Sequence, residues 1–282
     1  MNAVSVDGLT KSYGHVEALR GVSFEIRAGE VFGLLGPNGA GKTTTVEILE
    51  GYRRRDGGSV EVLSQDPDRA GGEWRERIGV VLQSSAMYPN LTARESLELF
   101  AGYYREPRDV ADVIGLIGLA EKRDARVKSL SGGQKRRLDL GLALVGDPEL
   151  LFLDEPTTGF DPGARRAAWE TIRSLRSLGK TILLTTHYLD EAEQLSDRVA
   201  VLREGRIVAL GRPTELSGDR QATEIRYRRN GREVVIRTDD PTRALHDLTA
   251  KAIAEGVELE DLEVRRPSLE QVYLSLTEAD EP

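Results

Sequence analysis

Phosphate-binding chemistry is indicated by a glycine-rich segment between an apolar run, Val31 to Leu35, and a helical pattern. The segment reads Gly36-Pro37-Asn38-Gly39-Ala40-Gly41-Lys42-Thr43-Thr44. Glycines let successive backbone N–H groups point into one concavity, and the following helix adds its positive N-terminal dipole. Lys42 would neutralise the β- and γ-phosphates of a nucleotide, and the Thr43 hydroxyl would coordinate Mg²⁺. A glycine-rich turn that carries Gly-Lys-Thr by chance is the alternative, and the strand-loop-helix context disfavours it.

Two carboxylates follow a second apolar run, Leu150 to Leu153. A Mg-nucleotide site needs a carboxylate at the end of a strand that neighbours the phosphate loop. Asp154 fits the Mg²⁺ role, and Glu155 could polarise the attacking water as a general base. Acidic residues also occur at ordinary solvated strand ends, but Pro156 and the upstream phosphate loop favour the catalytic interpretation.

A second anion site is predicted at Leu130-Ser131-Gly132-Gly133-Gln134. Ser131 would cap a helix, and the two glycines would expose its first N–H groups. One nucleotide needs only one such cradle. At this motif the sequence resembles the nucleotide-binding subunits of ATP-binding cassette transporters, whose signature LSGGQ is far more specific than the phosphate loop alone. The resemblance covers about residues 2–216.

The resemblance assigns roles to further residues. Tyr13 stands where the family stacks an aromatic ring on adenine, and Gln83 stands where the family has a glutamine that reaches Mg²⁺ and the attacking water. His187 resembles the histidine that contacts the γ-phosphate. Asp161 resembles the acidic residue of the D-loop, with Phe160 where Leu is common.

The resemblance also implies two partners: a second copy of this chain and a membrane permease. In the family, two subunits enclose two ATP molecules, and each phosphate loop is completed by the Ser131 to Gln134 motif and Asp161 of the opposite chain. The segment Met87 to Leu91 matches the surface that receives the membrane subunit. The implied cofactors are ATP and Mg²⁺.

The elements that must position these residues alternate between short strands and longer helices. Apolar runs at Ile78 to Leu82 and Thr181 to Thr185, together with the two runs above, predict an α/β core. The expected fold is a P-loop NTPase of the ATP-binding cassette type, with an antiparallel β subdomain and an inserted helical subdomain at about residues 87–147. Cap residues mark three helix starts: Thr92 with Glu95, Ser131 with Gln134, and Asp161 before Pro162.

A small α+β domain is predicted after a boundary near Gly218, so that residues 1–217 form the nucleotide-binding domain and residues 218–282 an accessory one. Asn230-Gly231 is a strong signal for a hairpin with a two-residue turn. A helix at 241–255, a strand at 259–265 and a helix from Ser268 would complete the domain. The turn predicts four cross-strand pairs: Tyr227 with Val234, Ile225 with Ile236, Glu224 with Arg237, and Arg228 with Glu233.

The closing segment narrows the resemblance. Residues 266–277, RPSLEQVYLSLT, are similar to the end of cassette ATPases paired with ABC-2 type permeases, including the daunorubicin-resistance type. Leu269, Val272, Tyr273 and Leu276 have helical spacing, which predicts an amphipathic docking helix.

Composition and charge exclude several classes. A chain of 282 residues with 39% hydrophobic and 30% charged residues is globular, and zero cysteines exclude disulfides and thiolate metal sites. The net charge of -8 argues against a nucleic-acid partner, and we expect the basic triplets Arg53 to Arg55 and Lys135 to Arg137 to be solvated surface. No run reaches the roughly 18 apolar residues of a membrane helix. The chain is therefore expected at the cytoplasmic face of the membrane, held there by its permease.

The sequence thus predicts a subunit that hydrolyses ATP to power a transporter, in particular an ABC-2 type exporter of drugs, antibiotics, lipids or polysaccharides. A soluble cassette ATPase that acts on DNA or ribosomes would carry a long coiled coil or a second cassette. The closing segment disfavours an importer ATPase. A module that only senses ATP would lack Glu155 or His187, and both are present.

Overall fold

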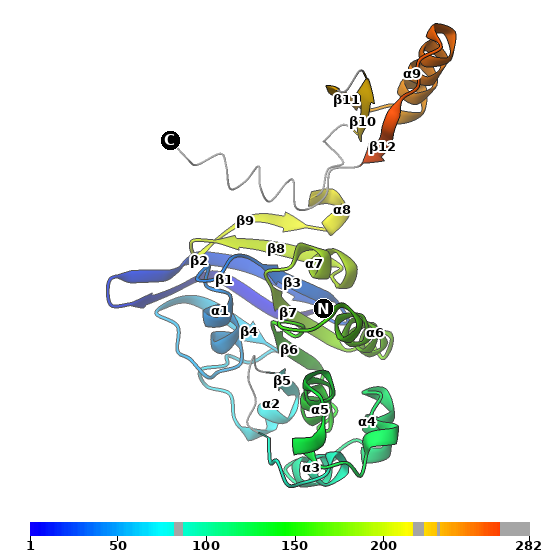
Figure 1. Ribbon diagram of the computed structural model, residues 1–282. Coiled ribbons are helices and arrows are strands. Elements are labelled where there is room, and N and C mark those ends of the chain that lie inside the picture. Colours follow the sequence, from blue (N-terminus) through cyan, green and yellow to red (C-terminus); the bar gives the residue numbers. More distant parts are fainter. Residues whose placement is uncertain (82–86, 217–222, 230–231, 266–282) are drawn as a thin grey trace. The chain divides into compact units, whose positions relative to one another are not determined.

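The computed structural model describes residues 1–81, 87–216, 223–229 and 232–265 (Figure 1). The chain divides into two compact units, Met1–Leu210 and Gly211–Pro282. This division lies before the boundary that the sequence predicts near Gly218.

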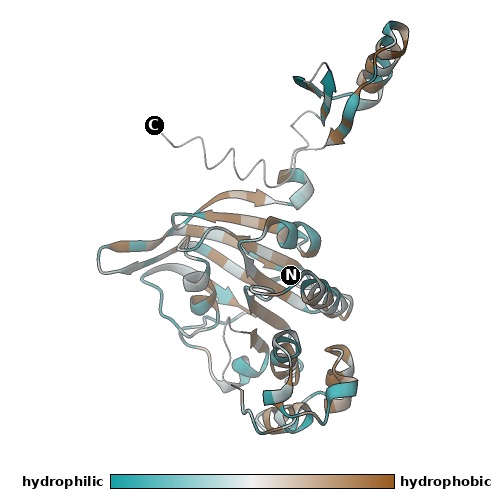
Figure 2. Cartoon of the chain, in the orientation of Figure 1, coloured by the Kyte–Doolittle hydropathy of each residue, from teal (hydrophilic) through white to brown (hydrophobic). Residues whose placement is uncertain are grey.

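The first unit is built on a six-stranded sheet. Neighbouring strands in the series β5, β6, β7, β3 and β8 pair in parallel, and β9 is hydrogen-bonded to β8 at the sheet's edge. Every residue of β3, β6 and β7 is buried, which explains why these strands read as continuous apolar runs in the sequence. Figure 2 shows the hydrophobic strands of this sheet in brown. The strand order is β5 (Ile78–Val81), β6 (Leu150–Asp154), β7 (Thr181–Thr186), β3 (Val31–Leu35), β8 (Arg198–Arg203) and β9 (Arg206–Gly211).

A second, antiparallel sheet confirms the expected β portion. Its order is β2 (Val16–Arg27), β1 (Asn2–Tyr13) and β4 (Gly57–Val62). Val22, Phe24 and Ile26 alternate inward from β2 into the core shared with the central sheet. There the ring of Phe24 stacks on that of Phe32, with centroids 5.2 Å apart.

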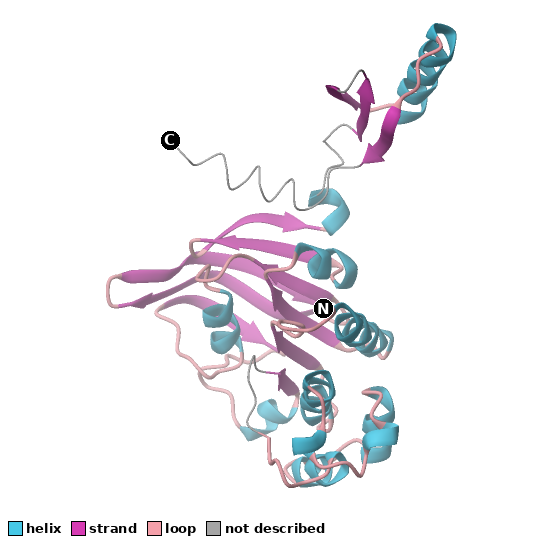
Figure 3. Cartoon of the chain, viewed as in Figure 1, coloured by secondary structure: helices cyan, strands magenta, loops and turns pink. Residues whose placement is uncertain are grey.

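The helices of the first unit, which are cyan in Figure 3, contribute to two apolar clusters. One cluster holds residues of α1 (Lys42–Leu49) and α2 (Gly72–Glu76) between the two sheets. The other holds residues of α6 (Pro162–Ser177) and α7 (Leu189–Leu195) on the central sheet. It extends into the segment 87–147, which contains α3 (Ala93–Ala101), α4 (Val110–Leu116), the 3-10 turns η1 (Ala120–Lys122) and η2 (Val127–Ser129), and α5 (Gly132–Leu144).

The predicted helix starts are confirmed. Thr92 caps α3 and Ser131 caps α5, each in a reciprocal capping box with the glutamate or glutamine three residues later. Asp161 caps α6 by accepting hydrogen bonds from the amides of Gly163 and Ala164, both at 2.9 Å.

The described part of the second unit contains a three-stranded sheet, β11-β10-β12, and the helices α8 and α9. All four predicted pairs stand opposite each other, and Glu224 forms a 3.0 Å ion pair with Arg237. Glu233 lies 3.7 Å from the guanidinium of Arg226, a diagonal neighbour rather than its direct partner Arg228. The turn residues 230–231 and the helix predicted from Ser268 lie outside the described residues. The elements are α8 (Pro213–Leu216), β10 (Thr223–Arg229), β11 (Arg232–Thr238), α9 (Pro241–Glu255) and β12 (Glu260–Arg265).

Within the described ranges, no helix has the length and apolar character needed to cross a bilayer.

Candidate active site

The phosphate loop connects the end of β3 to the start of α1, as its motif predicts. Gly41 has φ of 106°, a left-handed conformation that favours glycine, and a Cβ there would lie 2.7 Å from the carbonyl oxygen of Ala18. A Cβ on Gly36 would lie 2.3 Å from the carbonyl oxygen of Leu202. Pro37, Asn38 and Gly39 form the exposed part of the loop. Because the backbone of Ala18 and Leu202 lies this close, only glycine fits at positions 36 and 41 of the loop.

Lys42 lies inside this loop. Its Nζ donates hydrogen bonds to the carbonyl oxygens of Gly36, at 2.8 Å, and Pro37, at 3.2 Å. The same Nζ lies 3.5 Å from Oε1 of Glu155. Burial lowers the pKa of the amine, while the charges of Glu155 and Asp154 oppose that shift. Lys42 is thus a buried cation between the loop and the carboxylates of β6.

Glu155 begins the turn that follows β6 and has φ of 46°, which is uncommon for a residue with a side chain. Its Oε1 lies 3.2 Å from Nδ1 of His187, and its Oε2 accepts a 3.1 Å hydrogen bond from Thr158. Burial would raise the pKa of this carboxyl, but the contact with His187 and the charge of Lys42 hold it below its usual value. The carboxylate is therefore ionised at neutral pH, as a general base must be.

Thr185 is a site residue that the motifs miss. Its hydroxyl donates a hydrogen bond to Oδ1 of Asp154 and accepts one, at 3.0 Å, from the backbone amide of Glu155. Asp154 and Thr185 stand opposite each other in the pairing of β6 with β7. A buried threonine within a strand has no chemical signature in the sequence, and only the strand pairing would have identified it.

Three further predicted residues lie near the phosphate loop. Thr43 and Thr44 occupy the first turn of α1, and the hydroxyl oxygen of Tyr13 lies 3.5 Å from Oγ1 of Thr44. Tyr13 is 40% exposed, and the guanidinium of Arg53 lies 5.2 Å from its ring centroid. The ring of Tyr13 is thus at the surface beside the loop. Gln83 lies outside the described residues.

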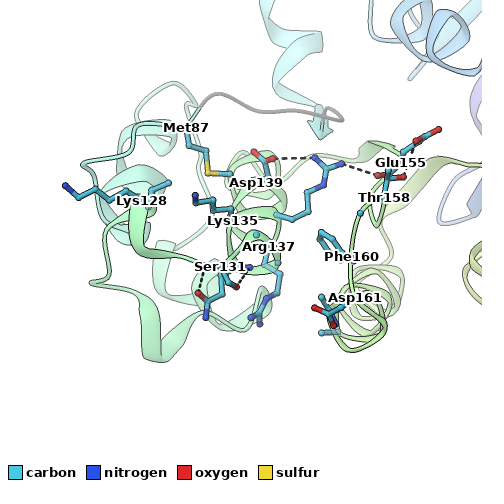
Figure 4. Close-up of a pocket in the computed structure, with 18 of the residues that line it drawn as sticks. Met87, Lys128, Ser131, Lys135, Arg137, Asp139, Glu155, Thr158, Phe160 and Asp161 are labelled. Atoms are coloured by element: carbon cyan, nitrogen blue, oxygen red, sulfur yellow. Dashed lines mark hydrogen bonds and ion pairs between the residues drawn. The ribbon is translucent and has the colours of Figure 1, made fainter.

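The signature motif lies at a different cavity, of about 940 Å³ (Figure 4). Ser131 and Gly132 are exposed at the start of α5. Figure 4 shows Ser131 on one side of the cavity and Phe160 and Asp161 on the other. Glu155 also lines it, whereas none of the phosphate-loop residues 36–44, all of which the structure describes, is among its lining residues. A single chain therefore keeps its two anion-binding motifs apart.

Two arginines of the basic triplets contradict the prediction of solvated surface. The guanidinium of Arg55 makes ion pairs with Asp66, at 2.7 Å, and Asp68, at 2.9 Å, and its side chain is 16% exposed. The side chain of Arg136 is 13% exposed and reaches the end of β6. Neighbouring charges in a sequence do not reveal which of them a helix or turn directs inward.

The donor set of the first site fits a Mg-nucleotide. A glycine loop at a helix N-terminus and a buried lysine match phosphate groups, while two carboxylates and hydroxyl groups match Mg²⁺. Asp154, which is 7% exposed, and Thr43 are the candidates for the metal.

Two family descriptions match the chain. "ABC transporter" matches residues 19–158, and "ABC transporter domain-containing protein-like, C-terminal domain" matches residues 215–268.

Similar proteins of known name cover nearly the whole chain. The daunorubicin resistance ATP-binding protein DrrA3 of Streptomyces coeruleorubidus is 40% identical over 99% of this chain and 96% of its own length. The Nod factor export ATP-binding protein I of Rhizobium meliloti is 42% identical over 98% of this chain and 88% of its own. Among solved structures, a dimeric ATP-binding cassette in a post-hydrolysis state with ADP and Pi matches with a TM-score of 0.66 and 25% identity, over 74% of this chain and 98% of the other.

Proposed function

The chain belongs to the ATP-binding cassette transporter family, and we propose that it is the ATP-hydrolysing subunit of an ABC-2 type exporter. Its fold and its phosphate loop are those of an ATPase that binds nucleotide. The names of its relatives refer to daunorubicin resistance and Nod factor export, which supports export as the direction of transport.

Hydrolysis would use the residues around Glu155. Lys42 binds and orients the β- and γ-phosphates, and Glu155 accepts a proton from the attacking water. His187, whose Nδ1 lies 3.2 Å from Glu155, orients that carboxylate and contacts the γ-phosphate. Asp154, Thr43 and Gln83 would hold Mg²⁺, which supplies positive charge to the phosphates. Tyr13 would stack on the adenine ring.

The second anion site supports a two-chain arrangement. Ser131 and Gly132 are exposed at the start of α5, and none of the described phosphate-loop residues of the same chain lines the cavity at Ser131 to Gln134. We assign this motif, with Asp161, to the nucleotide held by a second copy of the chain. The dimeric relative with ADP and Pi supports such an assembly.

A separate permease would supply the membrane path and would hold the subunit at the cytoplasmic face of the membrane. Residues 1–217 would form the nucleotide-binding domain, with residues 87–147 as its helical subdomain. Residues 218–282 would form an accessory domain for assembly or regulation.

One observation carries the catalytic proposal: Oε1 of Glu155 lies between Nζ of Lys42, at 3.5 Å, and Nδ1 of His187, at 3.2 Å. The test is Glu155→Gln, which keeps the shape of the side chain and removes the base. We expect ATP binding to remain while hydrolysis falls by about 10²- to 10⁴-fold. ATP should then persist in a dimer, measured by gel filtration with Mg-ATP.

The matched control is Glu149→Gln. Glu149 precedes β6, whereas Glu155 follows it, and the Glu149 side chain pairs with Arg77 at the surface. This variant should hydrolyse ATP at the wild-type rate. Wild-type turnover by Glu155→Gln, or its failure to dimerise with Mg-ATP, would contradict the role given to Glu155.

A further inference from the structure

Arg136 connects the signature helix to the turn that carries Glu155. Its Nη2 donates hydrogen bonds to the carbonyl oxygens of Asp154, at 3.0 Å, and Glu155, at 3.5 Å. Its Nε donates to the carbonyl oxygen of Pro156 at 3.3 Å. One guanidinium thus binds three consecutive carbonyl groups, and all three belong to the segment that ends β6.

These contacts hold the backbone at a residue with an unfavourable conformation. Glu155 has a left-handed φ of 46°, a conformation that persists in a residue with a side chain when its surroundings impose it. The Thr185 hydroxyl binds the amide of Glu155, and Arg136 binds the carbonyl group of the same residue. Both peptide groups of Glu155 are therefore held in place.

Arg136 is itself held in place. Its Nη1 lies 3.5 Å from Oδ2 of Asp139, one turn further along α5, and both side chains are mostly buried. Figure 4 shows Asp139 facing the turn that carries Glu155 and Thr158. A planar guanidinium with several fixed donors suits three carbonyl groups, whereas a lysine ammonium is a compact charge on a flexible stem.

We propose that Arg136 is a positioning residue for hydrolysis: by binding the carbonyl groups of Asp154, Glu155 and Pro156, it fixes the direction of the Glu155 carboxylate. This inference rests on the proposed role of Glu155 as the base. It assigns Arg136 no contact with the nucleotide, so its effect should appear in the rate of hydrolysis and not in the affinity for ATP. Small displacements of a catalytic group have large effects on rate, since a shift of about 1 Å costs on the order of 100-fold.

The experiment compares Arg136→Lys with Arg137→Lys in the full chain. Arg137 is the matched control, because its guanidinium donates to the carbonyl oxygens of Ile117 and Gly118, away from β6. Arg136→Lys should lower kcat by about 10- to 100-fold with KM and Kd for ATP unchanged, and ATP should accumulate in the Mg-ATP dimer. Arg137→Lys should keep the wild-type kcat.

A double variant separates positioning from a general loss of structure. In a Glu155→Gln background, Arg136→Lys should lower the residual single-turnover rate by less than about twofold, because the group that it positions is gone. If Arg136→Lys folds poorly by circular dichroism, Arg136→Gln with Asp139→Asn removes both buried charges and carries the same expectation.

Three results would overturn the inference. They are wild-type kcat in both folded Arg136 variants, a parallel loss of ATP affinity, or a full multiplicative loss in the Glu155→Gln background. If Glu155→Gln hydrolyses ATP at the wild-type rate, the proposed base and this inference both fail. Loss of hydrolysis in Glu155→Gln together with wild-type kcat in both folded Arg136 variants overturns the inference alone.

Discussion

The hydroxyl of Thr185 donates a hydrogen bond to the carboxylate of Asp154 across the β6–β7 pair, with 2.5 Å between Oγ1 and Oδ1. The same oxygen accepts the amide proton of Glu155. One fully buried side chain on β7 therefore orients the proposed Mg²⁺ ligand and the first peptide group of the catalytic turn.

Thr185→Val should lower Mg-dependent hydrolysis by about tenfold and raise the Mg²⁺ concentration needed for half-maximal rate. Valine has nearly the same shape as threonine but cannot hold Asp154, and outer-shell partners of metal ligands typically contribute 10- to 100-fold. The measurement is an ATPase titration with Mg²⁺ at saturating ATP. Thr171→Val is the control, because its hydroxyl bonds only within α6, to the carbonyl oxygen of Ala167 at 3.0 Å. Equal rates for both variants would contradict the role of Thr185.

Mixing Lys42→Ala chains with Gly132→Asp chains should restore ATPase activity that neither variant has alone. A mixed dimer combines both defects in one site and leaves the other site intact. Random mixing of equal amounts gives roughly a quarter of the wild-type sites. A Cβ on Gly132 meets no atom within 4 Å, and aspartate is favourable in the first turn of a helix, so Gly132→Asp should fold.

Native mass spectrometry would verify that mixed dimers form. If they form and the activity stays at zero, the two-chain site is wrong. Activity in Gly132→Asp alone would show instead that the signature does not bind nucleotide.

Glu50→Gln should remove part of the pH dependence of stability. Glu50 is the C-cap of α1, its Oε1 is buried without a hydrogen-bond partner among the described residues, and burial next to Asp154 and Glu47 raises its pKa from 4.5 to about 8. Between these values the folded chain keeps a proton that the unfolded chain releases. Rising pH therefore lowers the free energy of unfolding, by up to about 1.4 kcal/mol per pH unit.

The sign of this effect is testable by urea unfolding without nucleotide at several pH values. The variant should gain stability over the wild type as pH rises from about 4.5 to about 8, and the difference should then level off. A difference that is constant across this range would show that the pKa of Glu50 is not raised.

Truncation after Ser217 should leave ATP affinity at the wild-type value while self-association or transport with the permease weakens. The phosphate loop, Glu155 and His187 all belong to the compact unit that ends at Leu210. Equilibrium binding, analytical ultracentrifugation and transport assays give the three readouts. A folded core that does not bind ATP, or wild-type values in all three assays, would contradict the assignment of the C-terminal region.

Local signals in the sequence predicted much of this structure. The register of β10 with β11 followed from the Asn230-Gly231 pair, because a two-residue turn leaves only one alignment of its flanking strands. The strands β3, β6 and β7 were predicted because burial on both faces demands continuous apolar residues.

Features that depend on distant pairing were not predictable from such signals. β1 was not predicted, because its alternation is interrupted by irregular pairing with β2, as between Val6 and Leu9. The role of Thr185 depends on the register of β7 against β6. Arg136 and Arg137 are adjacent in the sequence, yet a turn of about 100° per residue directs one toward β6 and the other toward Gly118. The predicted role of Gln83 and the helix from Ser268 remain predictions.

The bend at residue 155 is held through its own amide and through the carbonyl groups of residues 154–156. These groups are present with any amino acid except proline at the position, because only proline lacks the amide proton. A substitution of Glu155 would therefore remove the base while the backbone contacts that hold the turn remain. After gene duplication, one codon change would thus suffice to produce a paralogue that binds nucleotide without hydrolysing it. Binding and hydrolysis could then be separated in evolution without a change of fold.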